Sequence, residues 1–250
     1  MKRQKVRKLL LLVSFLLFPV TIFYFSPVLI ITGGFSGIVT GSFLVFAAQF
    51  VLSLVFGRAF CGWICPSGGL QECCCLQITD KKVKSRKVDW VKYIIWVLWI
   101  ITITFAFIMA GKVKDVNFFY MTDHGISVSG LTELIIYLFF VGLITILALT
   151  LGRRGMCHSI CWMAPFMVIG TKIKDRLGNP SLHLDADLTK CVQCGLCSKN
   201  CPMGLEVSKM VQNGRLNHSE CILCGKCADL CNKRAIKLTF RTPKEYGTKP

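Results

Sequence analysis

The sequence predicts a helical membrane protein with a small, cysteine-rich α+β domain at its C-terminal end. The 250 residues are 53% hydrophobic with a mean hydropathy of +0.56, which is too apolar for a soluble domain of this length. The apolar residues gather in four long runs flanked by basic residues, and the last third carries closely spaced cysteines instead.

The four apolar runs predict four transmembrane helices. They extend over Leu9–Thr32, Gly37–Phe56, Val91–Ala110 and Leu131–Leu151, and each is close to the roughly 20 residues that a spanning helix needs. The first run follows a basic start and so resembles a signal peptide. Its length and the lack of a small-residue cleavage site favour a retained helix.

The basic residues predict which side of the membrane each connection faces. Lys and Arg crowd into residues 1–8, into 58–92 and into the stretch after 151, whereas 111–130 hold few. Because cytoplasmic loops are enriched in Lys and Arg, we expect a multi-pass protein of the cell inner (cytoplasmic) membrane with both termini in the cytoplasm. The formal net charge of +17 then belongs to a membrane face, and we expect no nucleic-acid partner.

Residues 162–178 join an apolar patch to three basic residues. This pattern predicts an amphipathic helix that either lies on the membrane surface or packs against the spans as a fifth, partial helix. A Gly-Asn-Pro sequence at 178–180 predicts a linker. It divides a membrane domain, residues 1–178, from a C-terminal domain, residues 179–250.

The C-terminal domain contains two tandem cysteine runs with the spacing C-x-x-C-x-x-C-x-x-x-C. This spacing is the signature of a bacterial two-cluster ferredoxin-like domain, in which the fourth cysteine of each run ligates the other [4Fe-4S] cluster. Structural zinc also uses C-x-x-C pairs, but seldom this pattern twice over, and a reducing compartment disfavours disulfides. Short strands predicted at Ser181–Asp185 and Ala235–Phe240 would bring the ends of the domain together. We assign one cluster to Cys191, Cys194, Cys197 and Cys231, and the other to Cys221, Cys224, Cys227 and Cys201.

The membrane half contains an internal repeat. Each two-span hairpin ends in Gly-Arg followed by C-x-x-I-C, at Cys61 and Cys65 and again 96 residues later at Cys157 and Cys161. Cysteines four residues apart share a face if the segment is helical, and an axis along the membrane normal would relate the hairpins. We therefore expect four thiols to meet at the cytoplasmic boundary and to hold an additional iron or iron–sulfur centre. Dithiol redox chemistry, zinc, and cysteines that merely pack helices are the alternatives.

Other candidate residues have competing interpretations. Cys73, Cys74 and Cys75 are either buried or lipid-facing cysteines, or one of them is an additional ligand. His158 lies within the second motif and is either a proton donor or metal ligand, or an interfacial polar residue. His124 is in the outer loop with Asp123 and Tyr120 nearby, and is either a proton acceptor of a quinol site or a solvated residue without a function, which is the interpretation we favour.

A resemblance to a known family rests on residues 58–66 (RAFCGWICP) and 68–72 (GGLQE). They resemble the NapH/NosR/CcoG group of membrane polyferredoxins, and the similarity covers nearly the whole chain and is closest to the NapH type. The first motif matches C-x-x-x-C-P in full, whereas Trp162 replaces the proline of the second. The resemblance implies membrane electron transfer, commonly between quinol and a partner redox protein. The periplasmic flavin-binding domain of the NosR branch has no counterpart in these short outer loops.

These features predict an electron-transfer subunit rather than a stand-alone enzyme. The predicted spans contain no histidine, and the chain has neither a C-x-x-C-H motif nor a Gly-rich dinucleotide fingerprint, which argues against haem and NAD(P). We expect electrons to pass between a soluble cytoplasmic partner and a membrane carrier, for which quinone is a candidate, or a partner redox subunit. The basic surface favours an acidic partner such as a ferredoxin or flavodoxin. A maturation factor or a redox-sensing regulator of another metalloenzyme are the alternatives.

Overall fold

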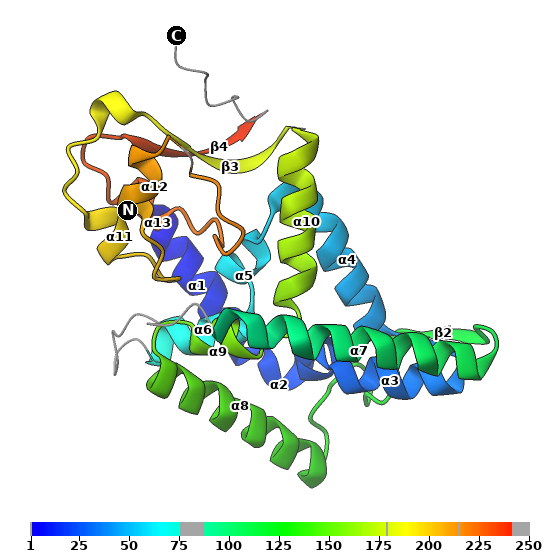
Figure 1. Cartoon of the computed structure of the whole chain (residues 1–250). Helices are drawn as coiled ribbons and strands as arrows, with labels where there is room; N and C mark the ends of the chain where they lie inside the picture. The colour runs from blue at the N-terminus through cyan, green and yellow to red at the C-terminus, as the bar shows by residue number, and fades with distance from the viewer. Residues whose placement is uncertain (1, 76–87, 179, 215, 242–250) are drawn as a thin grey trace.

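Long helices make up most of the structure, and a small two-stranded sheet lies at one end (Figure 1). The structure, a computed structural model, describes residues 2–75, 88–178, 180–214 and 216–241. Most of the basic residues between positions 58 and 92 therefore lie outside the described residues, as does Asn179 of the predicted linker.

The first predicted span is not one helix. It is divided into α1 (Lys2–Leu16), α2 (Phe18–Thr21), the 3-10 helix η1 (Ile22–Phe25) and α3 (Pro27–Ser36). The helix axis bends by 60° after α1. Two prolines lie at the breaks, Pro19 at the start of α2 and Pro27 at the start of α3, because proline lacks an N–H and disfavours helical geometry in the residue before it. The continuous helix predicted over Leu9–Thr32 is therefore wrong.

Two helices of the described part are long and apolar enough to cross a membrane, and the bent segment from α1 to η1 would make a third. They are α7 (Val88–Ala110) and α8 (Leu131–Leu151), which match the third and fourth predicted spans closely. α4 (Gly41–Phe56) corresponds to the second span but has only 16 residues. Its length of about 24 Å falls short of the roughly 30 Å of a bilayer core. The predicted arrangement of four spans in two hairpins is not confirmed.

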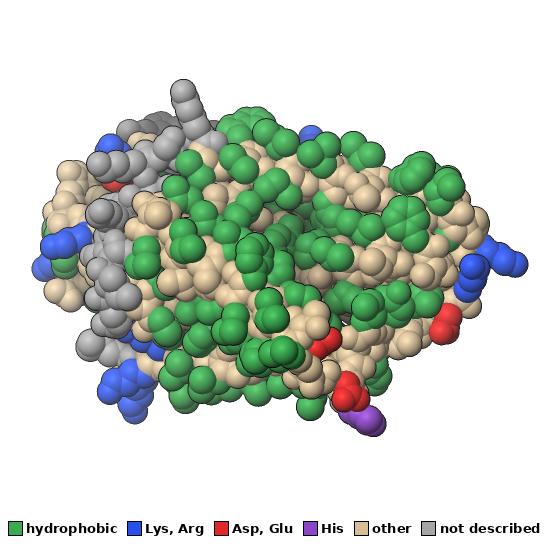
Figure 2. Space-filling view, turned by 90° about the horizontal axis from the view of Figure 1, so that it is seen from below, with side chains coloured by type: hydrophobic (Ala, Val, Ile, Leu, Met, Phe, Trp, Pro, Cys, Tyr) green, Lys and Arg blue, Asp and Glu red, His purple; other side chains and the backbone are tan. Residues whose placement is uncertain are grey.

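Apolar side chains cover the face to which α2, α3, α7 and α8 contribute. Figure 2 views this face from below Figure 1, and hydrophobic side chains dominate it while the charged ones lie toward its edges. On α7 the exposed residues include Ile94, Leu98, Ile101, Phe105 and Ile108. A contiguous apolar surface of this kind is typical of protein that lipid covers.

α10 (Ala164–Leu177) is the helix predicted over residues 162–178, and it packs along α4. The two helices are in close contact at Gly170, where a Cβ atom would lie 1.7 Å from Ser53 Oγ. Of the two predicted arrangements, the structure therefore shows the helix packed against a neighbouring apolar helix. At the far end of α4, β1 (Ile38–Thr40) pairs in parallel with β2 (Asp115–Asn117).

The C-terminal part is closed by an antiparallel pair of strands, β3 (Ser181–Ala186) and β4 (Ile236–Arg241). Both predicted strands are confirmed to within one residue. Between them lie η4 (Leu188–Lys190), α11 (Leu196–Lys199), α12 (Val207–Gln212) and α13 (Lys226–Asp229). The pair brings the two ends of this part together, so that the cysteine loops lie on one side of the sheet.

One hydrophobic core connects the long helices to the C-terminal part. It includes Phe46 of α4 and Trp99 of α7, whose rings lie 5.3 Å apart, and continues through Met167 of α10 to Ile222 and Ile236. α1 also rises from the lower helices toward the C-terminal part (Figure 1). The cysteine loops are therefore held against the ends of α4 and α8, where the two C-x-x-x-C motifs lie.

Candidate metal centres

α4 and α8 end in the same way. Gly57 and Gly152 follow them with φ angles of 54° and 104°, a conformation that glycine adopts at low cost. Each glycine leads into a five-residue helix, α5 (Ala59–Trp63) after α4 and α9 (Gly155–Ser159) after α8. The repeat seen in the sequence is therefore a repeat of local structure.

In both motifs the first cysteine lies on the short helix and the second follows its end. The N–H of Cys65 donates to the carbonyl of Phe60 at 3.0 Å, and the N–H of Cys161 donates to the carbonyl of Met156 at 3.1 Å. These are i→i+5 bonds, so each motif closes as a wide turn. The condition under which both cysteines would share the face of one α-helix is therefore not met.

The four cysteines of the two motifs, named here the motif thiols, nevertheless converge. Cys61, Cys65 and Cys157 are buried and Cys161 is half-buried. Burial raises the pKa of the Cys65 thiol, and the nearby thiols of the other three raise it further. All four sulfur atoms therefore lie within electrostatic reach of one another, as the repeat predicted.

The donor set fits iron or an iron–sulfur cluster. Thiolates are the ligands that such clusters use, and all fifteen cysteines, which lie within the described ranges, are free. Buried thiols with raised pKa values are neutral at pH 7, and metal binding would release their protons.

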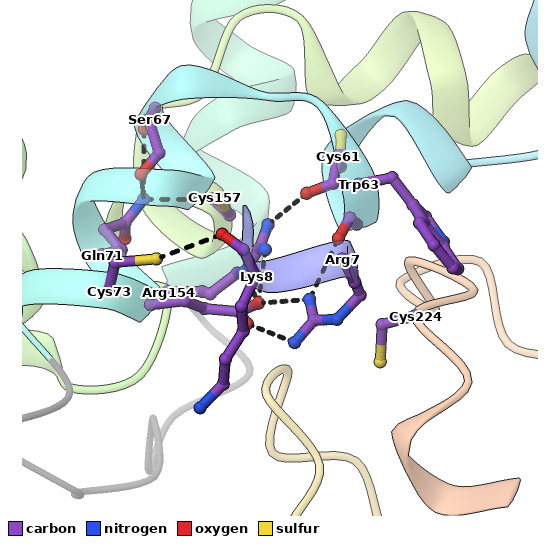
Figure 3. A network of polar contacts seen from close by, with 12 residues as sticks. Arg7, Lys8, Cys61, Trp63, Ser67, Gln71, Cys73, Arg154, Cys157 and Cys224 are labelled. Carbon is purple, nitrogen blue, oxygen red and sulfur yellow. Dashed lines mark hydrogen bonds and ion pairs between the residues drawn. The ribbon is translucent and has the colours of Figure 1, made fainter. Parts of the chain in front are cut away.

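Beside the motif thiols lies a buried ion network of Arg7, Glu72 and Arg154. Figure 3 shows Arg7 and Arg154 of this network close to Cys61 and Cys157. Arg7 Nη2 lies 2.6 Å from Glu72 Oε2, and Arg154 Nε lies 2.9 Å from Glu72 Oε1. The same arginines donate to consecutive carbonyls of the first motif, Arg7 to Gly62 at 3.0 Å and Arg154 to Cys61 at 2.5 Å. Burial alone would raise the pKa of Glu72, but the charge of Arg154 and the hydrogen bonds from Arg7 lower it to about 2.

A second buried network joins the first motif to the C-terminal part. Arg58 Nη1 lies 2.5 Å and Lys92 Nζ 2.8 Å from Glu220 Oε2, and the Tyr93 hydroxyl donates to Glu220 Oε1 at 3.4 Å. Burial opposes ionisation of Glu220, yet Arg58 and Lys92 lower its pKa to about 2. Glu220 directly precedes Cys221, so the network ties the first motif to a cysteine run.

Two cavities of the C-terminal part are each lined by four cysteines, three from one run and the last from the other. The larger, of about 180 Å³, is lined by Cys191, Cys194, Cys197 and Cys231. The smaller is lined by Cys221, Cys224, Cys227 and Cys201. These are the two groupings that the spacing predicted, although binding of a cluster in either stays a prediction.

The two cysteine loops have matching backbones. Gln193 and Leu223, each directly before the second cysteine of its run, have positive φ angles of 55° and 48°, and Gly195 and Gly225 follow with 73° and 69°. Turns with positive φ angles of this kind direct successive backbone N–H groups into one concavity, which can bind an anionic group. The cysteine at 194 is exposed and the one at 224 is buried, so the two cavities differ in their access to solvent.

The loop between Cys221 and Cys224 lies directly on the first motif. A Cβ atom at Gly62 would lie 2.2 Å from the carbonyl oxygen of Ile222, and the Trp63 indole donates to the carbonyl of Leu223 at 3.1 Å. The cavity lined by Cys221, Cys224, Cys227 and Cys201, named here the buried cysteine cavity, therefore adjoins the first motif. The cavity lined by Cys191, Cys194, Cys197 and Cys231 is named the exposed cysteine cavity.

The N-terminal helix contacts the same loop from another side. Gln4 Nε2 donates to the carbonyl of Cys224 at 2.9 Å, and Arg3 Nη2 donates to the carbonyl of Gly225 at 3.3 Å. Arg3 also pairs with Asp229 at 2.7 Å. α1 thus holds the buried cavity against the long helices.

An apolar cavity of about 70 Å³ adjoins the motif thiols on the side away from the C-terminal part. Cys65 and Cys161 both lie on its wall, together with aromatic and aliphatic residues of α2, η1 and α8. Trp162, which stands where the first motif has proline, also lines it and donates from its indole to the carbonyl of Phe25 at 3.0 Å.

The other candidate residues have different neighbours. The π-helix η2 (Leu70–Cys74) follows the short α6 (Pro66–Gly69). Cys73 is half-buried and Cys74 is exposed on η2, and Cys75, directly after its end, is buried. His158 Nδ1 lies 2.7 Å from Asp89 Oδ1. His124 is exposed and lies 2.6 Å from Asp123.

The sequence places Arg58 in the repeated Gly-Arg pair, but it predicted no role for the charged residues of the two networks. One signal was available: Arg58 and Arg154 each stand three residues before the first cysteine of a motif, 96 residues apart like the cysteines themselves. The partners Glu72 and Glu220 follow no comparable pattern.

Two family models match parts of the chain. A family model described as a 4Fe-4S binding domain matches residues 38–74 and 133–180, and one described as a 4Fe-4S dicluster domain matches 190–236. The first matches the two motif regions and the second the tandem cysteine runs. No solved structure matches.

Three curated relatives show the extent of the similarity. The uncharacterized protein MJ0750 of Methanocaldococcus jannaschii is 28% identical over 78% of this chain and 77% of its own length. The "Putative electron transport protein YccM" of Escherichia coli is 22% identical over 88% of this chain and 61% of its own length. The ferredoxin-type protein NapH of Haemophilus influenzae is 26% identical over 79% of this chain and 68% of its own length. At low identity but over most of its length, the chain is therefore similar to NapH-type ferredoxin proteins, and it contains regions that match 4Fe-4S family models.

Proposed function

We propose that this protein relays electrons within a membrane, between a soluble cytoplasmic redox partner and a membrane carrier or partner redox subunit. The observation that carries this proposal is the order of the sulfur sites. The exposed cysteine cavity, the buried cysteine cavity and the motif thiols follow one another, and the last two meet where Gly62 contacts Ile222. An electron that enters at one end thus has neighbouring sites to occupy, and each site gives up one electron for each that it receives.

Two [4Fe-4S] clusters would bind in the two cysteine cavities, each held by four thiolates. Such clusters take up and release single electrons. The cysteine loops are held in place by the β3–β4 pair, the contacts from α1, and the ion pair between Arg58 and Glu220.

A third centre, of iron or iron–sulfur type, would bind at the motif thiols. Their convergence, their burial and the match of both motif regions to a 4Fe-4S binding family model support this step. Dithiol chemistry is less suited to the site, because burial raises the pKa of the Cys61, Cys65 and Cys161 thiols and the thiolate is the reactive form.

The apolar wall of the cavity beside Cys65 and Cys161 suits contact with a lipid-soluble carrier such as a quinone. Its wall includes Phe18, Ile22, Phe140 and Ile144, from elements of the apolar face. Apolar pockets with few polar groups are the usual sites of such ligands. A carrier bound there would contact Cys65 and Cys161, which are two of the four proposed ligands of the third centre.

The soluble partner would dock at the exposed cysteine cavity. Cys194 is exposed, the neighbouring Val192 and Leu196 are exposed apolar residues, and Lys233 lines the same cavity. An apolar centre with basic residues around it suits an acidic ferredoxin or flavodoxin. The basic residues near the cysteine loops and α1 favour the cytoplasmic side for this end of the protein.

Anaerobic iron and sulfide analysis with low-temperature EPR tests the proposal. The full chain in detergent should contain more than about eight iron ions, the content of two cubane clusters. Joint replacement of Cys61 and Cys157 by alanine should lower the iron content while the two ferredoxin-type signals persist. The matched control replaces Cys73 and Cys74 by alanine and should retain the full iron content. Colourless protein, or zinc in place of iron, would overturn the relay.

A further inference from the structure

The motif thiols lie between two buried networks that contain more cations than carboxylates. Arg7 and Arg154 share Glu72, whereas Arg58 and Lys92 share Glu220. All four cationic side chains are 0–1% exposed, which makes them among the most buried large side chains of the described part.

This excess is costly unless an anion lies nearby. Burying an ion costs several kcal/mol, and only close opposite charge offsets it. In the second network Asp89 adds a further carboxylate, 3.9 Å from Lys92, but it is part-exposed and also binds His158. Among the described residues, Glu72 is the only carboxylate that pairs with Arg7 and Arg154 in the first network. Four neutral thiols would leave its extra positive charge uncompensated.

Arg58 has free hydrogen-bonding capacity. Its Nη1 binds Glu220 at 2.5 Å and the carbonyl of Ser219 at 3.4 Å. Its Nε and Nη2 are buried and have no hydrogen-bond partner among the described residues. A buried guanidinium with unpaired N–H groups signals an acceptor that belongs there, and the thiols of Cys61 and Cys157 interact electrostatically with it.

We propose that the two networks are the counter-charge of an anionic four-thiolate centre, and that Arg58 raises its reduction potential. This inference rests on the proposed third centre. Four thiolates around a [4Fe-4S] core that carries two positive charges leave a doubly negative centre, and the buried cations offset that charge. Reduction adds one more negative charge, so a nearby cation makes uptake of the electron more favourable.

Arg58 thus acts on the centre through its positive charge, which favours reduction. The carboxylate of Glu220 partly neutralises that charge. The two residues can be separated because their replacements act in opposite directions. Arg58→Met removes the cation and should lower the reduction potential of the centre. Glu220→Gln leaves the cation but removes its carboxylate partner, and should raise the potential. Arg58→Lys should keep it near the wild-type value.

The test is an EPR-monitored redox titration of the complete protein in detergent, with iron content measured on each variant. The control is Arg241→Met, which breaks an arginine–carboxylate pair with Asp185 on the β3–β4 sheet and should leave the potential unchanged. Shifts of opposite sign for Arg58→Met and Glu220→Gln support the inference. Shifts of the same sign, or equal loss of iron from both variants, would mean that the pair only holds the structure together.

The remaining outcomes are also decisive. If Arg58→Met does not assemble, Glu220→Gln decides alone: a raised potential supports the inference and an unchanged one overturns it. If the wild type contains two clusters only, the third centre and this inference both fail. If a third centre is present and Arg58→Met leaves its potential unchanged, this inference alone fails and the relay stands.

Discussion

The backbone of Gly62 lies against the carbonyl oxygen of Ile222, where a Cβ atom would approach to 2.2 Å. Gly62 is the second residue of the first C-x-x-x-C motif, and Ile222 follows the first cysteine of the second run. The contact brings a loop of the C-terminal part onto the turn that carries Cys61 and Cys65. Glycine at residue 62 is what permits this approach, because any larger residue would collide with backbone atoms.

Gly62→Ala should therefore separate the two sulfur sites. We expect destabilisation of about 1–3 kcal/mol from overpacking, together with slower electron exchange between the C-terminal clusters and the motif thiols. Thermal unfolding in detergent and freeze-quench EPR after rapid reduction measure the two effects. Gly142→Ala on α8 is the control, because a Cβ atom there would meet no atom within 4 Å. Equal stability and equal rates in both variants would contradict the importance of this contact.

Sequence patterns predicted those parts of the fold and site that are set by residues close together along the chain or by a repeated segment. The gaps between cysteines determined the grouping around the two cavities, since three thiols separated by two-residue gaps wrap one centre. α7 and α8 are uninterrupted apolar segments and were placed to within a few residues. The repeat of 96 residues also predicted that Cys61 and Cys157 would meet.

The features that the sequence did not predict depend on distant partners or on single prolines. Glu72 binds Arg7 and Arg154, which lie 65 and 82 residues away along the chain, and no local pattern records such a pairing. Pro19 and Pro27 lie inside an apolar run whose hydropathy alone resembles one span. Hydropathy measures how favourable transfer of a segment into lipid is, but it does not detect breaks in a helix. The prolines restrict the backbone, and the helix is interrupted where they lie.

Serine replacement of the fourth cysteine of each run should remove different clusters. Cys231→Ser should empty the exposed cavity and Cys201→Ser the buried one, because each run contributes its last thiol to the other cavity. Each variant should lose up to about four iron ions per chain, with a different EPR signal missing. Loss of the same signal from both variants would contradict the exchanged ligation.

The stability of the buried networks should depend on pH in acid. The pKa values of Glu72 and Glu220 are lowered from 4.5 to about 2 in the folded protein. Their stabilisation is therefore fully present above about pH 4.5 and is lost as the pH falls toward 2, with about 3 kcal/mol at stake for each group.

The measurement is the difference in unfolding free energy between the wild type and Glu220→Gln, followed from pH 7 to pH 3. Comparison of two proteins with the same cysteines removes the acid lability of clusters from the result. The advantage of the wild type should shrink as the pH falls. A difference that stays constant over this range would show that Glu220 does not contribute as a carboxylate.

Electron exchange with an acidic soluble protein should slow as salt rises. The Debye length shortens from about 10 Å at 0.1 M to about 3 Å at 1 M ionic strength, so the attraction that brings the partner to Lys233, beside the exposed cysteine cavity, is screened. Lys233→Glu should reduce the rate at low salt and flatten its salt dependence, as stopped-flow mixing with a reduced acidic ferredoxin would measure. Lys112→Glu makes the same charge change at an exposed residue just beyond the end of α7 and should leave the rate unchanged. Equal effects of the two substitutions would mean that the net charge of the protein, rather than this surface, guides the partner.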